Sequence, residues 1–170
     1  GLNDDWEFEK YFLKLNPSCK IIAYDHTINK KFWKDRFKKD LISLILFKKL
    51  RFKKILDVFK YIDYRSFFNE KNIHYIKKVV LKKKNKNEIS IKNILLNHKD
   101  LILKVDIEGD EYKILNHIKR DYKKINLLII EFHNISQNFK KIEKFISKSR
   151  YKLIHIHGNN YAGLDKFKNP

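Results

Sequence analysis

Four carboxylates stand within the six-residue segment Asp-Ile-Glu-Gly-Asp-Glu, directly after an apolar run and directly before a helical pattern. A helix N-terminus needs only one capping acid, and Asp110 is placed to serve as that cap, with Glu111 favoured by the helix dipole. Gly109 suits a tight turn between strand and helix. Asp106 and Glu108 precede the helix and are not needed as caps. We therefore interpret these two carboxylates as candidates for binding or proton transfer.

Polar side chains also end the other apolar runs of the chain. Asp25 ends the run over 19–25, and Glu131 and His133 end the run over 125–133. His157, followed by Asn159, ends the run over 151–157. Each has an ordinary alternative, because a histidine at a strand end is often structural and an aspartate can simply start a turn. Their shared position makes a joint site the sharper hypothesis.

The order of predicted elements points to an α/β fold. Apolar runs predict strands over 19–25, 73–81, 101–107, 125–133 and 151–157, and amphipathic patterns predict helices over 4–15, 89–98, 110–122 and 136–149, with two more within 29–68. Such alternation implies right-handed crossovers and a mostly parallel sheet with helices on both faces. Ligands bind at the carboxyl ends of the strands in such sheets. We therefore expect Asp25, Asp106, His133 and His157 at one edge.

Length and composition favour one domain over 1–170, with a Lys-rich helical insertion at about 29–68. Cys19 is the single cysteine, so an intramolecular disulfide is excluded and a reducing compartment is the default. No apolar stretch approaches the roughly 20 residues that cross a bilayer, and the first residues lack the order of a signal peptide. These features predict a soluble, cytoplasmic protein.

The formal charge of +19 raises two further alternatives. Lysine and arginine bind phosphate backbones, so a nucleic-acid-binding module is one. The excess is nearly all lysine, accompanied by residues with A/T-rich codons, and genomic composition accounts for that mixture without a partner. The other alternative is peripheral membrane or partner binding through the insertion, where aromatic residues alternate with lysine, although core packing also explains them: Trp33, Phe37, Phe47 and Phe52.

Two segments, "LKVDIEGDEYKIL" and "LLIIEFHNI", resemble the FkbM-type methyltransferases, in which one strand ends in Asp-(Val/Ile)-Glu-Gly and the next in Glu-x-His. The resemblance extends to "GLNDDWEFE", "AYDHT" and "HIHGNNYAGLD". It covers nearly the whole chain apart from the Lys-rich helices. It implies a class I, Rossmann-like three-layer sandwich, whose first strand and last antiparallel strand would lie outside this sequence.

The resemblance also implies binding of S-adenosylmethionine and methyl transfer to a hydroxyl, here of a saccharide or lipid-linked glycan. Carried over by position, Gly1 would end the glycine turn at the cofactor and Asp25 would accept hydrogen bonds from its ribose. Asp106 and Glu108 would face its methionine portion. The acceptor pocket would contain His133, His157 and Asn159. An RNA methyltransferase is the variant that the charge favours.

The chemistry of such a site needs alignment more than activation, because a sulfonium methyl is already activated. A general base can add roughly 10²-fold or more, with His133 the first candidate and Asp106 the second. No metal is required. As strand residues, His155 and His157 would point to opposite faces, which is unsuited to shared ligation. We therefore expect no metal site.

Overall fold

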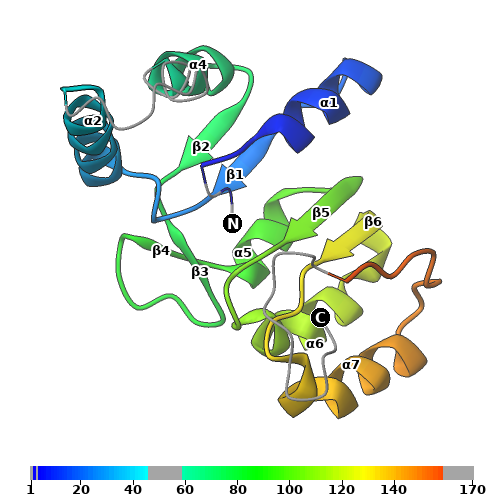
Figure 1. The fold of residues 1–170 in the computed structure, drawn as a ribbon. Helices are drawn as coiled ribbons and strands as arrows, with labels where there is room; N and C mark the ends of the chain where they lie inside the picture. The colour runs from blue at the N-terminus through cyan, green and yellow to red at the C-terminus, as the bar shows by residue number, and fades with distance from the viewer. Residues whose placement is uncertain (1, 3, 46–58, 159–170) are drawn as a thin grey trace.

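The computed structural model describes residues 2, 4–45 and 59–158 and shows a mixed α/β chain (Figure 1). The helices are α1 (Glu7–Leu15), α2 (Lys30–Ile45), α4 (Lys60–Phe67), α5 (Ile91–Asn97), α6 (Glu111–Arg120) and α7 (Ile135–Lys148), with a short 3₁₀ helix at Tyr122–Lys124. The strands are β1 (Ile22–Tyr24), β2 (Ile73–Tyr75), β3 (Lys78–Val80), β4 (Glu88–Ser90), β5 (Leu101–Val105) and β6 (Ile125–Ile130).

The strands form three separate parallel pairs, β1 with β2, β3 with β4, and β5 with β6. The parallel direction agrees with the prediction, but within the described residues these pairs are not joined into one sheet. The predicted strand over 73–81 is also wrong as a single element. The backbone N–H of Lys77 turns back to the carbonyl oxygen of Tyr75 at 2.8 Å, which separates β2 from β3.

The predicted strand over 151–157 is wrong for this structure, because residues 151–158 adopt no regular secondary structure. A strand is stabilised by hydrogen bonds to a neighbouring strand, and no described strand pairs with this segment. Its apolar side chains are accordingly open to solvent, with Ile154 81% and Ile156 74% exposed.

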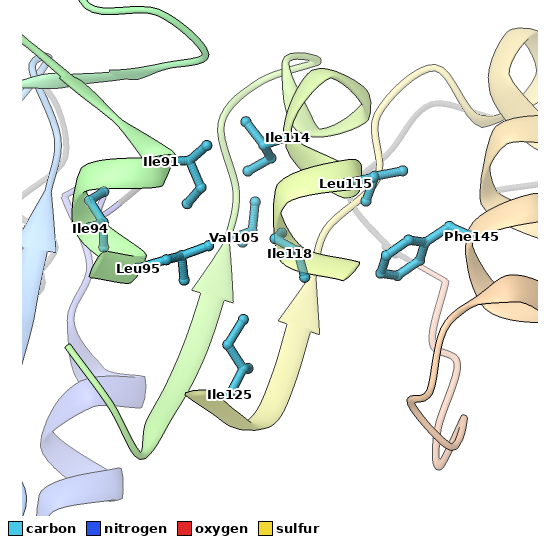
Figure 2. Close-up of a cluster of buried hydrophobic side chains, with 9 residues drawn as sticks. All are labelled: Ile91, Ile94, Leu95, Val105, Ile114, Leu115, Ile118, Ile125 and Phe145. Carbon is cyan, nitrogen blue, oxygen red and sulfur yellow. The ribbon is translucent and has the colours of Figure 1, made fainter. Parts of the chain in front are cut away.

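The main core lies between β5–β6 and the helices α5, α6 and α7, which Figure 2 shows around Val105 and Ile125. Strand side chains alternate between faces, so Leu103 and Val105 pack on this core while Ile102, on the other face, is 42% exposed. Leu127 and Ile129 of β6 are likewise 39% and 36% exposed. The described residues thus bury one face of β5–β6 beneath helices.

A second core holds the N-terminal segment against the Lys-rich region. Leu2, Trp6 and Phe68 are buried together, with Trp33 of α2 packed against them. Figure 1 shows α1, α2 and α4 gathered around β1 and β2. Trp33 therefore contributes to packing, as one of the two interpretations expected.

The remaining aromatic residues of the insertion differ. Phe37 is 57% exposed, while Phe47 and Phe52 lie outside the described residues. Within the described ranges, every helix is too short or too polar to span a bilayer.

Candidate functional site

The loop after β5 carries the first two candidate residues. Asp106 follows Val105 directly, and the chain then turns through Glu108 at φ 55° and Gly109 at φ 97°. Both angles lie in the left-handed region, which glycine adopts without the steric cost that a Cβ brings. The tight turn predicted at Gly109 is confirmed. It leaves the Glu108 side chain 82% exposed, beside the end of the strand.

His133 reaches the same place from β6. The parallel register pairs Val105 with Ile130, so the residues that follow the two strands leave the sheet at one end. Nε2 of His133 lies 3.4 Å from Oε2 of Glu108 and 4.0 Å from Oδ1 of Asp106. The structure therefore brings together three of the predicted residues: Asp106, Glu108 and His133.

Glu111 is the residue of this site that the sequence reasoning missed. It is 0% exposed, although the sequence reasoning treated it only as an acid that the helix dipole favours. Its Oε1 accepts hydrogen bonds from the backbone N–H of Ile107 at 3.2 Å and of Gly109 at 2.9 Å, and lies 3.0 Å from Nδ1 of His133. A signal was present in the sequence, because Glu111 lies on the apolar stripe of α6 with Ile114 and Ile118.

Tyr112, the next residue of α6, binds the main chain of His133. Its hydroxyl donates to the main-chain carbonyl oxygen of His133 at 2.5 Å. Burial, with the neighbouring carboxylate of Glu111, raises the pKa of Tyr112, so this hydroxyl keeps its proton. Two consecutive residues at the start of α6 thus bind the ring and the backbone of one histidine.

The prediction that the Asp110 side chain caps α6 is wrong. Asp110 occupies the N-cap position, but its side chain makes no capping hydrogen bond. Its carboxylate instead contacts Nζ of Lys113 at 2.5 Å and lies 3.9 Å from Nζ of Lys78. The ammonium groups of Lys113 and Lys78 thus bind the carboxylate that the sequence predicted to accept backbone N–H groups of α6.

Asp25 lies after β1, in a different strand pair, and its carboxylate is buried. Oδ2 accepts the backbone N–H of Leu2 at 2.7 Å, and Oδ1 accepts the N–H and the hydroxyl of Thr27 at 2.7 and 2.6 Å. Asp25 therefore starts a turn with Thr27, which is the ordinary alternative given for this aspartate. The same carboxylate accepts the backbone N–H of Leu2, so Leu2 lies beside the residue that follows β1.

His74 supports this turn from β2. Its Nε2 lies 2.9 Å from the carbonyl oxygen of Asp25, and its Nδ1 lies 2.6 Å from the hydroxyl of Tyr64. A carbonyl oxygen only accepts, so Nε2 carries the hydrogen and Nδ1 accepts from the tyrosine. Burial lowers the pKa of His74, against the opposing effect of the Asp25 carbonyl and carboxylate.

The remaining predicted residues are not joined to this cluster by any described contact. His157 is exposed, and its ring stacks on His155 with centroids 6.1 Å apart. The expectation that these two rings point to opposite faces fails because the segment is not a strand. Gly1 and Asn159 lie outside the described residues.

Asp106, Glu108 and His133 are also a possible ligand set for a metal. One oxygen from each carboxylate and one ring nitrogen lie within 4.8 Å of one another. The expectation of a site without metal therefore stays a prediction. A pocket of about 300 Å³ lies elsewhere, with none of the predicted site residues in its lining: Ile22, Tyr24, Tyr75, Lys77, Ile89, Asn97 and His98.

Comparison with known proteins gives one match. No curated protein and no solved structure is significantly similar to this sequence. The family model described as the methyltransferase FkbM domain matches residues 6–153, a range that contains Asp25 and the whole cluster around His133. Because that match spans most of the 170 residues, this chain belongs to the FkbM methyltransferase family.

Proposed function

We propose that this protein is an S-adenosylmethionine-dependent methyltransferase that methylates a hydroxyl group of a saccharide or glycan. The observation that carries the proposal is the convergence of Asp106, Glu108 and His133 at the ends of β5 and β6, in a chain of the FkbM family. A ring nitrogen beside two carboxylates is suited to take a proton from an acceptor hydroxyl. Methyl transfer to a hydroxyl oxygen is assisted by a general base of this kind.

The residues fit the cofactor chemically. S-Adenosylmethionine supplies a methyl group already activated on a positively charged sulfur, and its ribose hydroxyls and ammonium group are hydrogen-bond donors. Carboxylates are the acceptors that match those groups. The Glu108 side chain is 82% exposed, which leaves it accessible to a ligand.

Asp25 is the proposed partner of the ribose. Asp25 directly follows β1, and a carboxylate at the end of that strand is suited to accept hydrogen bonds from ribose hydroxyls. Gly1, next to Leu2, is proposed to approach the methionine end of the cofactor.

His133 is the proposed general base. Bound S-adenosylmethionine would supply the methyl group for the acceptor oxygen, and Nε2 of His133 would take the proton of the acceptor hydroxyl. Asp106, 4.0 Å from Nε2, stabilises the imidazolium that results. His157 and Asn159 are proposed to line the acceptor side.

Calorimetric titration of the full-length protein with S-adenosylmethionine, followed by transfer of a labelled methyl group to a panel of oligosaccharides and lipid-linked glycans, tests the proposal. We expect binding and transfer, with transfer but not binding lost in His133→Gln. His117→Gln is the matched control, because His117 contacts Arg120 at the far end of α6. Absence of cofactor binding to the folded protein would refute the proposal, and transfer to RNA alone would support the RNA alternative.

Peripheral membrane contact through α2 stays a second proposal for this region. Phe37 is 57% exposed on a helix rich in lysine, which suits an anionic lipid surface. Co-sedimentation with anionic vesicles, compared between the protein and Phe37→Ser, tests it. Equal sedimentation of both, or of neither, would contradict it.

A further inference from the structure

Glu111 is a buried titratable residue to which the proposed function assigns no role. Its side chain is 0% exposed, and it shares the buried face of α6 with Ile114, Leu115 and Ile118. A carboxylate among apolar side chains is costly unless specific partners compensate for the lost water. Its second oxygen, Oε2, has no hydrogen-bond partner among the described residues, so its compensation is concentrated on Oε1.

Oε1 joins two parts of the site. The backbone N–H groups of Ile107 and Gly109 belong to the loop that carries Glu108, and the third contact is the ring of His133. One oxygen atom therefore connects the loop after β5 with the residue after β6. The distances of 3.2, 2.9 and 3.0 Å are all those of hydrogen bonds.

These contacts decide which ring nitrogen carries the hydrogen. Backbone N–H groups only donate, so Oε1 is an acceptor for both of them. The remaining contact of this oxygen, to Nδ1 of His133, is a hydrogen bond only if Nδ1 carries a hydrogen. A neutral ring then has its lone pair on Nε2, because the hydrogen bond of one ring nitrogen fixes the state of the other. Nε2 is the nitrogen that faces Glu108 and Asp106.

We infer that Glu111 is the positioning residue for His133, holding the imidazole in the Nδ1–H form with Nε2 as the proton acceptor. This inference rests on the proposed function for its catalytic meaning. Glu111 is 0% exposed and contacts the His133 ring, so it acts on the ring and does not touch the substrate. Tyr112 binds the main-chain carbonyl oxygen of His133 and does not contact the ring nitrogens in that bond. The position of the ring hydrogen is therefore set by Glu111.

Nitrogen NMR of the protein labelled at histidine tests the hydrogen position without any substrate. The His133 signals are assigned by their loss in His133→Gln, and spectra are recorded at a pH where the ring is neutral. We expect protonated Nδ1 and unprotonated Nε2 in the wild-type protein, and a shift to protonated Nε2 in Glu111→Ala. Tyr112→Phe is the control, and its His133 ring should keep the wild-type pattern.

Turnover tests the catalytic meaning. Glu111→Ala should lower kcat by about 10- to 100-fold, the size of effect that outer-shell partners of a functional histidine have, with KM for the cofactor nearly unchanged. Glu111→Gln keeps a carbonyl oxygen for the same three donors, so it should retain the Nδ1–H form and restore most of the lost turnover. It also serves as the informative variant if Glu111→Ala does not fold.

Protonated Nε2 in the wild-type protein would overturn the inference, as would a Glu111→Ala ring that stays in the Nδ1–H form. A loss of kcat that only follows the lost folded fraction would overturn it as well. If the wild-type ring shows the Nδ1–H form but no methyl is transferred to any acceptor, the hold by Glu111 stands and the proposed function fails.

Discussion

Nε2 of His74 donates to the main-chain carbonyl oxygen of Asp25 at 2.9 Å, which fastens β2 to the turn after β1. The second ring nitrogen accepts from Tyr64, so both nitrogens are used in the neutral form. Protonation of Nδ1 would require the Tyr64 hydroxyl to change from donor to acceptor, and burial disfavours the charged ring. The contact of His74 with the turn that carries Asp25 is therefore made by a neutral histidine.

This relationship predicts a pH dependence of stability. The pKa of His74 is lowered in the folded protein from its usual 6.5, so below about pH 6.5 the unfolded chain binds more protons than the folded one. Stability from this residue is present above that pH and is lost as the pH falls toward the folded-state pKa. In urea unfolding at pH 7.5 and 5.5, the midpoint of the wild-type protein should fall more than that of His74→Gln. An equal fall in both would show that His74 has no part in it.

Asp25→Ala should weaken both folding and cofactor binding. The substitution leaves the buried N–H of Leu2 without its acceptor, a loss of about 1 to 3 kcal/mol of stability. Loss of the proposed charge-assisted hydrogen bond to ribose should also raise the Kd for S-adenosylmethionine roughly ten-fold or more. Calorimetry on the folded fraction separates the two effects. An unchanged Kd would mean that Asp25 stabilises its turn but does not bind the cofactor.

Asp110→Ala should change the free energy of unfolding by less than about 1 kcal/mol, because an exposed ion pair with Lys113 contributes little. Ser90→Ala provides the comparison, since the Ser90 hydroxyl does cap α5 by accepting the N–H of Asn93 at 3.2 Å. That substitution should cost about 1 kcal/mol. Chemical denaturation of both variants measures the difference, and a larger cost at Asp110 would restore it as a cap.

Asp106→Asn should lower single-turnover methyl transfer by about 10²-fold or more with little change in Tm, because it keeps the shape but removes the charge beside Nε2 of His133. Asp121→Asn is the control, since Asp121 pairs with Arg120 beyond the end of α6. If Asp106→Asn keeps full activity, the carboxylate contributes only structure.

Methyl transfer should be unchanged after dialysis against a chelator, because the proposed cofactor carries an activated methyl group and His133 is the proposed proton acceptor. Activity before and after chelation, with Mg²⁺, Zn²⁺ or Mn²⁺ added back, measures this. Activity that is lost and then restored by one ion would instead assign Asp106, Glu108 and His133 as its ligands.

The sequence alone determined the elements whose periodicity is strong. The apolar run 101–105 forms β5, and the stripe through Ile114 and Ile118 forms α6, because side chains repeat every two residues in strands and every 3.6 in helices. The meeting of Asp106 and His133 followed from the same reasoning, since parallel neighbouring strands end at one edge. Local pattern was sufficient to predict these elements and the meeting of these two residues.

Tertiary structure decided the features that depend on distant partners. The break between β2 and β3 and the absence of a strand over 151–157 depend on which edges are available for pairing, which a run of apolar residues does not encode. The exchange of roles between Asp110 and Glu111 has the same origin. Both acids suit a helix start, but only Glu111 faces the core. There its carboxylate is shielded from water, and Ile107, Gly109 and His133 supply its hydrogen bonds.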